Sequence, residues 1–152
     1  MKQLIANLLT LVAITFTSAV WAGPVEEVAQ IAGPRQQAFQ QGNVENWVGA
    51  YADNAVLHSS FSPFRIEGKD AIRAYAAQYF QMYPKRGFVV RQPVARVYGD
   101  NLVIQNGYSV INVTNEKGEP KTYDARYTTV WNKIDGRWQI VDSHVSRLPL
   151  AQ

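Results

Sequence analysis

The chain has 152 residues, with 15 lysines and arginines against 12 aspartates and glutamates, so its formal net charge is +3. Nucleic-acid binding needs a concentrated basic patch. The basic residues here are scattered, with no run longer than Lys85-Arg86, so we expect no nucleic-acid partner. The sequence contains no cysteine. Its fold must therefore rely on a hydrophobic core rather than on disulfides.

Residues 1–22 have the pattern of a secretory signal peptide: one early lysine, an apolar run from about Leu8 to Val20, and small residues around Ala22. The apolar run is short for a transmembrane helix. We therefore expect cleavage near Ala22 and a periplasmic or secreted protein that does not contact the membrane afterwards. An uncleaved anchor is the alternative. Residues 23–152 are expected to form a single domain.

The first part of this domain is predicted to be helical. Residues 24–42 read as a helix in which Gly33-Pro34 introduces a kink or a second start, because proline disrupts a helix interior. Asn43 is a predicted N-cap. It opens a short helix over residues 43–51, whose apolar positions, including Trp47, fall on one face.

A strand is predicted over residues 55–61, with His58 on the same face as Val56. Residues 68–84 form the most regular predicted helix of the chain. Its apolar and aromatic side chains recur at helical spacing, and Tyr75 and Tyr79 belong to this stripe.

The rest of the chain alternates between polar and apolar residues, as strands do. Pro93 predicts that residues 88–98 form an edge strand or a bulged strand. Asp135-Gly136 is a two-residue hairpin signal between the last two strands. The predicted strands cover residues 88–98, 102–114, 122–134 and 137–147. Helices followed by an antiparallel or mixed meander predict an α+β domain, with a curved sheet wrapped around helices and a cone-shaped cavity.

Three segments carry a resemblance to a known family: NWVGAYADNAVLHSSF, EGKDAIRAY and ARYTTVWNKIDGRWQIVDSHVSRLP. Their order resembles the nuclear transport factor 2-like superfamily, and most closely its SnoaL-like members. It is also similar to the SgcJ/EcaC-type bacterial relatives of the calcium/calmodulin-dependent protein kinase II association domain. The resemblance covers roughly residues 40–149.

This resemblance implies a cystatin-like α-α-β-α-β-β-β-β fold, a small-molecule pocket and a homodimer or larger homo-oligomer. It does not decide between functions, because the same fold carries isomerases, dehydratases, cyclases and binding modules. Kinase association domains line their pocket with arginines on the sheet. Ser109 and Thr129 stand where two of these arginines are expected.

Asp142 and His144 are the candidate catalytic residues. Strict alternation places them on one strand face together with Trp138 and Ile140. A histidine beside a carboxylate can act as a general base near neutral pH. A ligand contact and a structural role for His144 remain open alternatives. Arg126, in the middle of a strand, is either a pocket arginine that binds a carboxylate or a solvated side chain.

Several aromatic and polar residues are candidate ligand contacts in an apolar pocket with a few polar groups. These are Arg126, Tyr108, His58, Tyr75, Tyr79 and Trp47. His58 and His144 could converge, but the sequence supplies no third ligand at a metal-binding spacing. We expect neither a metal nor a cofactor.

Three functions follow, in descending order of preference. The first is an exported, homo-oligomerising domain that binds a small apolar, aromatic or carboxylate-bearing molecule. The second is a cofactor-free lyase, isomerase or hydrolase in which Asp142 and His144 transfer a proton while Arg126 and Tyr108 hold an oxyanion. The third is a structural dimer or hub domain.

Overall fold

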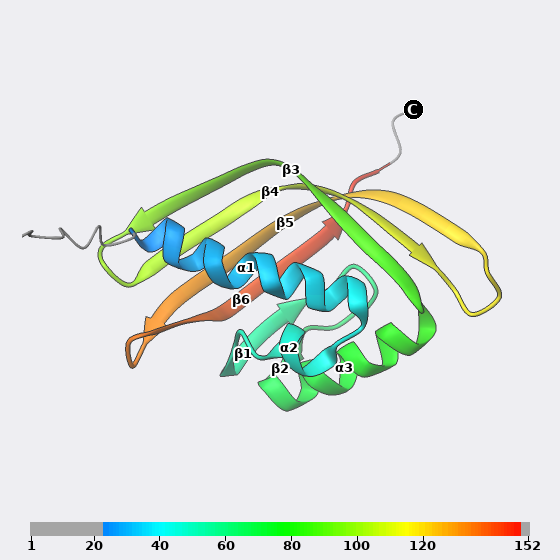
Figure 1. Cartoon of the computed structure of the whole chain (residues 1–152), viewed down its shortest axis with the longest axis horizontal. Coiled ribbons are helices and arrows are strands. Elements are labelled where there is room, and N and C mark those ends of the chain that lie inside the picture. The colour runs from blue at the N-terminus through cyan, green and yellow to red at the C-terminus, as the bar shows by residue number, and fades with distance from the viewer. Residues whose placement is uncertain (1–22, 150–152) are drawn as a thin grey trace, which may run out of the picture.

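In the computed structural model, which describes residues 23–149, three helices lie against a curved sheet of six strands (Figure 1). The elements are α1 (Pro24–Gln41), α2 (Val44–Val48), β1 (Tyr51–His58), β2 (Ile66–Glu67), α3 (Lys69–Met82), β3 (Lys85–Tyr98), β4 (Leu102–Thr114), β5 (Pro120–Ile134) and β6 (Arg137–Arg147). The strand order is β2-β1-β6-β5-β4-β3. β1 pairs in parallel with β6, and the other neighbours are antiparallel. The expected α+β class with a curved, mixed sheet is confirmed.

The signal-peptide prediction concerns residues 1–22, which lie outside the described residues. Within residues 23–149, none of the helices is both long enough and apolar enough to cross a membrane.

Helix α1 is one continuous helix with Pro34 inside it, so the predicted second start does not occur. Part of the strain that a proline brings to a helix is a clash with the Cβ and the N–H of the preceding residue. That residue is Gly33, which has no Cβ, so this part of the strain is smaller here. The helix ends at Gly42, which adopts φ 75° and donates its N–H to the last turn. Asn43 caps α2 as predicted, since its side chain accepts a 3.0 Å bond from the Asn46 N–H.

Strand β1 begins four residues earlier than predicted and ends at His58 rather than at residue 61. It starts directly after α2 because Tyr51 already pairs with Ile140 of β6. A turn closed by the bond from the Ser62 N–H to the Ser59 carbonyl, at 3.1 Å, follows the strand.

A bulge in β6 reverses the alternation of its side chains. Trp131 of β5 pairs with Ile140 of β6. Val130, directly before Trp131 in β5, pairs with Asp142, so Val141 of β6 has no partner residue and is an extra residue. An extra residue moves every later side chain to the other face of the sheet. Ile140 and Ser143 therefore both face the helices. The predicted shared face of Ile140, Asp142 and His144 is wrong.

Strand β3 is both an edge strand and a bulged strand, as Pro93 predicted. The register shifts between Arg91 and Val94, and Gln92 adopts φ 49°. Gly107 of β4 packs against this bulge. A Cβ there would lie 3.1 Å from the carbonyl oxygens of Arg91 and Gln92. The glycine thus allows the two strands to pair tightly beside the bulge.

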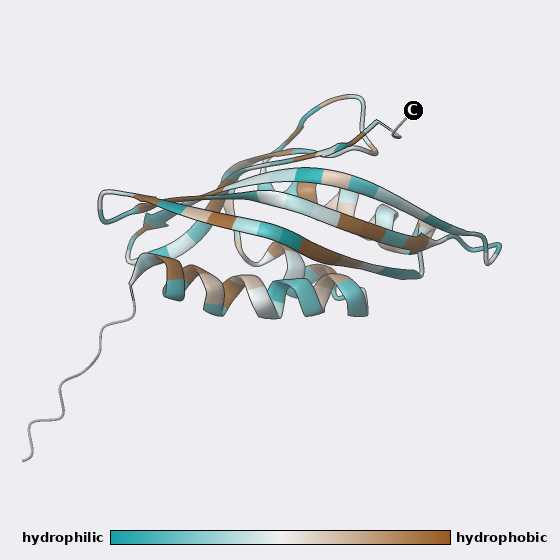
Figure 2. Ribbon diagram, turned by 90° about the horizontal axis from the view of Figure 1, so that it is seen from above, coloured by the Kyte–Doolittle hydropathy of each residue, from teal (hydrophilic) through white to brown (hydrophobic). Residues whose placement is uncertain are grey.

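The core lies between the helices and the sheet, and Figure 2 shows α1 running alongside the strands. Trp131, Tyr51 and Ile140 are at most 1% exposed and meet where β5, β6 and β1 are neighbours. At the hairpin end of the sheet, Glu27 of α1 accepts hydrogen bonds from Lys133 and from the Trp138 indole, at 2.7 and 2.5 Å. These bonds fasten the start of α1 to the β5–β6 hairpin.

Candidate functional site

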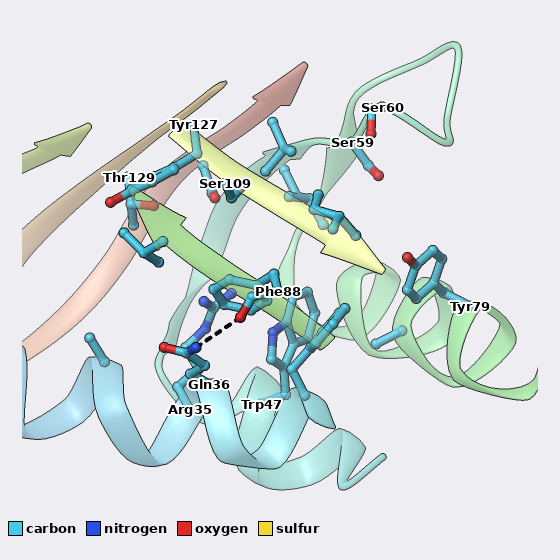
Figure 3. A pocket seen from close by; sticks show the side chains of 18 of the residues that line it. Arg35, Gln36, Trp47, Ser59, Ser60, Tyr79, Phe88, Ser109, Tyr127 and Thr129 are labelled. Atoms are coloured by element: carbon cyan, nitrogen blue, oxygen red, sulfur yellow. Dashed lines mark hydrogen bonds between the residues drawn. The ribbon is translucent and has the colours of Figure 1, made fainter. Parts of the chain in front are cut away.

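A cavity of about 320 Å³ lies between the inner face of the sheet and the three helices (Figure 3). Its volume is within the usual range of small-molecule sites, at the lower end. Figure 3 shows Arg35, Gln36 and Trp47 reaching from the helices, with Ser109, Tyr127 and Thr129 on the strands.

Aromatic side chains make up a large part of the cavity wall. Phe39 of α1 stands at its centre and contacts Trp47, Tyr79, Phe80 and Phe88, with ring centroids 5.4 to 6.4 Å apart. Edge-to-face and tilted pairs at these distances stabilise one another beyond their buried area. This part of the wall is therefore apolar, and a flat hydrocarbon surface can pack against it.

The candidate residues Trp47, Tyr75 and Tyr79 all line this cavity. Tyr75 and Ser59 share a hydrogen bond of 2.5 Å between their hydroxyl groups. Burial raises the pKa of Tyr75 and raises that of Tyr79 far more. Both phenols are therefore neutral at physiological pH and act as hydrogen-bonding groups. Whether these three residues contact a ligand stays a prediction.

Arg35 of α1 is the single charged side chain among the described residues that line the cavity. One of its terminal nitrogens donates to the Tyr51 hydroxyl at 2.7 Å. The guanidinium carbon lies 4.6 Å from the centre of the Trp47 ring and 5.0 Å from that of Tyr51. The Arg35 Nε is buried and has no hydrogen-bond partner within residues 23–149. The Nε is too buried to meet a ligand, whereas the terminal nitrogen that does not bond Tyr51 makes no hydrogen bond within residues 23–149 and remains available as a donor.

The sequence interpretation missed Arg35, although its pattern contained the signal. Val28, Ala38 and Phe39 are buried, and Ile31 and Ala32 pack beside the core. Arg35 falls on this stripe, seven residues after Val28 and three before Ala38, which is the spacing of one helix face. The expected break at Gly33-Pro34 concealed that continuity.

The other five candidate residues lie on the face of the sheet that points away from the cavity, called here the outer face. His58 and His144 are directly opposite each other on β1 and β6, with ring centroids 5.6 Å apart. Arg126 of β5 pairs with Tyr108 of β4, and both are exposed. Asp142 is half-buried on the same face, two residues before His144.

The two sets of candidate residues therefore lie on opposite sides of the sheet, one in the cavity and one on the outer face. Ser143 and Val145 line the cavity at the positions where strict alternation placed Asp142 and His144. None of the described lining residues is an aspartate, glutamate, histidine or lysine. The described residues of the cavity therefore include no carboxylate–imidazole pair for proton transfer. Across residues 23–149, no group of three or more histidine, cysteine, aspartate or glutamate residues is placed to hold a metal ion.

Solved structures with the same fold come from several bacteria. A Xanthomonas campestris protein assigned as a calcium/calmodulin-dependent protein kinase II association domain is 25% identical, with a TM-score of 0.74 over 91% of this chain and 100% of its own. A Streptomyces avermitilis protein assigned as a dehydratase of the NTF2-like family is 14% identical, with a TM-score of 0.73 over 82% and 97%. A Novosphingobium aromaticivorans protein assigned as a scytalone dehydratase is 9% identical, with a TM-score of 0.74 over 82% and 84%.

The last two similarities concern the fold alone. No protein with curated annotation matches the sequence significantly. Residues 25–149, which include all of the cavity wall, match the calcium/calmodulin dependent protein kinase II association domain. The chain therefore belongs to this family, and it shares its fold with NTF2-like proteins, as the order of its elements predicted.

Proposed function

We propose that this domain binds a small, mostly aromatic or apolar molecule that carries an anionic group, in the cavity between the helices and the sheet. The observation that carries the proposal is Arg35, the one cation among the described residues that line a cavity rich in aromatic side chains. A guanidinium favours carboxylates because it can donate two parallel hydrogen bonds to them.

The position of Arg35 also fits an anion rather than a structural ion pair. Among the described residues no carboxylate lines the cavity with it. Arg35 also lines a neighbouring pocket with Glu27 and Glu45, but these two carboxylates pair with Lys133 and Arg73. Cation–π contacts with Trp47 and Tyr51 help to hold the guanidinium in place. In a cavity with few water molecules, such a charge attracts an anion more strongly than in bulk solvent.

A binding function is favoured over catalysis for this cavity. The dehydratases among the similar structures show only that the fold can carry such enzymes. In this chain, Asp142 and His144 are on the outer face. Tyr75 and Tyr79 stay protonated because burial raises their pKa values, so neither supplies a phenolate base. We therefore propose a binding domain without a reaction of its own.

The experiment measures the binding of naphthoate and of its neutral analogue naphthylmethanol by calorimetry. The wild-type protein is expected to prefer naphthoate. Arg35→Met removes the charge and keeps the length of the side chain, so its naphthoate affinity should fall about ten- to a hundredfold, the range for a hydrogen bond to a charged group. Binding of naphthylmethanol should change little.

Arg126→Met is the matched control, because Arg126 is the arginine that the sequence favoured and it lies on the outer face. Its naphthoate affinity should equal that of the wild type. Arg35→Lys, which keeps the charge but loses the planar fork, should be intermediate. Loss of binding in Arg126→Met together with normal binding in Arg35→Met would place the site on the outer face and overturn the proposal. Thermal unfolding of each variant controls for damage to the fold.

We also propose that the domain is a homo-oligomer whose copies meet through the outer face. On this face Tyr108 is 47% exposed and Val89, on the neighbouring strand, is 57% exposed. Apolar surface of this kind on a sheet is typical of an interface. Light scattering should report more than one copy, and Tyr108→Glu should shift the protein to monomer. A wild-type monomer at all concentrations would refute this assembly.

Export is the third part of the proposal and rests on the pattern of residues 1–22. The mass of the protein recovered from the periplasm or the medium should correspond to a chain that begins near Gly23. A full-length mass in a membrane fraction would instead support the uncleaved anchor.

A further inference from the structure

A row of uncharged polar side chains crosses the inner face of the sheet in the middle of the aromatic cavity. Gln105 of β4 pairs with Thr129 of β5, which pairs with Ser143 of β6, and the next neighbour is Leu57 of β1. All four residues line the cavity. Neighbouring strands are about 4.8 Å apart, so three polar groups follow one another across roughly 10 Å.

The amide of Gln105 is oriented by its neighbour. The Trp131 indole N–H donates to Gln105 Oε1 at 2.9 Å, and Trp131 is 1% exposed. Since the oxygen accepts this buried bond, the amide nitrogen of Gln105 is left to donate. A ligand atom that meets this end of the row must therefore be an acceptor.

The two hydroxyl groups of the row are buried and free to serve a ligand. Ser143 is 5% exposed and Thr129 is 9% exposed. Between the described cavity residues, the hydrogen bonds that involve a side chain join Arg35 to Tyr51, Gln36 to the Phe88 carbonyl, Ser59 to Tyr75 and to the Phe61 N–H, and Trp131 to Gln105. None of these bonds uses Thr129 or Ser143. Buried polar groups are normally paired, so the row is suited to a partner that enters the cavity.

Two features of the row favour a neutral group over a second anion: it carries no charge, and its hydroxyls both donate and accept. It lies on the sheet, whereas Arg35 projects from α1. The aromatic rings of Phe39, Trp47 and Phe88 line the same cavity. A matching molecule therefore carries an anionic group at one point and a neutral oxygen at another, joined by a flat apolar body.

We propose that Gln105, Thr129 and Ser143 form a neutral polar subsite for a hydroxyl or carbonyl group, and that the ligand is a hydroxy- or oxo-substituted aromatic acid. This inference rests on the proposed function, because it assumes that Arg35 binds the anionic group. It adds the second substituent and the residues that select it.

The test compares naphthoate with a set of its hydroxy-substituted isomers, which direct the hydroxyl to different points of the wall. The best isomer is expected to bind the wild type about two- to tenfold more tightly than naphthoate, as one hydrogen bond allows. The double variant Thr129→Val/Ser143→Ala should lose this preference and still bind naphthoate. Both substitutions remove a hydroxyl and keep the shape of the side chain or shorten it slightly, so the fold should persist.

The matched control exchanges the same residue types on the other face of the same strands. Thr128 lies next to Thr129 and faces outward, and Ser146 of β6 pairs with Arg126 on the outer face. Thr128→Val/Ser146→Ala should keep the wild-type preference. Light scattering of both double variants checks that assembly is unchanged.

The outcomes separate this inference from the proposed function. Naphthoate binding that depends on Arg35, with no gain from any hydroxyl isomer, overturns the polar subsite and leaves the proposed function standing. A gain that survives in Thr129→Val/Ser143→Ala also overturns it, because other groups then hold the hydroxyl. Absence of binding for every probe overturns both.

Discussion

The bulge at Val141 predicts that Ile140 and His144 contribute very differently to stability, although strict alternation gives them one environment. Ile140→Ala removes three carbons from a side chain that is 0% exposed. Their transfer to water costs about 2.4 kcal/mol at about 0.8 kcal/mol for each group. The flanking Tyr51 and Trp131 are large rings that cannot close the gap, so a cavity term brings the loss to about 3–4 kcal/mol.

His144 is exposed on the outer face, so His144→Ala should change the free energy of unfolding by less than about 0.5 kcal/mol. Urea unfolding followed by tryptophan fluorescence measures both variants, with equal slopes required for the comparison. The two midpoints should therefore differ clearly. Measurements at two protein concentrations separate core effects from assembly, since only the latter depend on concentration. Similar losses for both variants would refute the bulge and return His144 to the inner face.

Three other perturbations test separate parts of the structure. Gly107→Ala places a Cβ 3.1 Å from the Arg91 carbonyl and should cost about 1–3 kcal/mol in urea unfolding; an unchanged midpoint would contradict the tight β3–β4 pairing. Burial raises the pKa of Tyr123 to about 12 and that of Tyr79 further, so the folded state keeps protons that the unfolded chain releases above pH 10. Stability should therefore fall as the pH rises from 10 to 12, and Tyr123→Phe should lessen the fall; a flat profile would contradict the burial. The Arg147 guanidinium lies 4.6 Å from the centre of the Tyr123 ring, and Arg147→Ala should cost about 0.5–1 kcal/mol, whereas Arg147→Lys should cost less.

Much of the fold could be predicted from local sequence patterns, because contacts with distant parts of the chain do not change the structure that these patterns favour. The stripe of α3 at helical spacing, the N-cap Asn43 and the Asp135-Gly136 turn each act over a few residues. Both turn residues adopt positive φ, at 49° and 75°, as a two-residue hairpin of this kind requires. Pro93 signals the edge strand because it cannot donate to a ladder. Such features are fixed by covalent geometry and are visible in sequence.

The start of β1 and the bulge of β6 were not predictable in the same way. Both depend on pairing between residues far apart in the chain, such as Tyr51 with Ile140. Val141 looks like any other apolar residue of an alternating strand, and nothing local marks it as the extra one. Its identity as a bulge depends on which residue of β5 it opposes.

The candidate site residues show the same difference between local features, which the sequence predicts, and features that depend on long-range strand pairing. Trp47, Tyr75 and Tyr79 were found because they lie on helices, where a stripe at helical spacing identifies the inward face. His58, Arg126 and Tyr108 lie on strands, where one shift of register exchanges inside and outside. The helical Arg35 could have been found by the same rule as the aromatic residues if Gly33-Pro34 had not been interpreted as a break, because α1 runs through it.

One inserted residue thus determines which chemistry this cavity can support. Without the bulge, β6 would direct Asp142 and His144 towards the aromatic wall, and a carboxylate there would pair with Arg35 or remain costly to bury. With the bulge, Ser143 and Val145 take these places, and the charge of Arg35 remains available to a ligand. Two proteins of this fold with the same residues in β6 but different bulge positions would present opposite sets of side chains. Residue type and spacing do not determine on which face of the sheet a residue pair of the last strand lies. A catalytic role can therefore be assigned to such a pair by comparison with another protein of this fold only after the register of the last strand has been established.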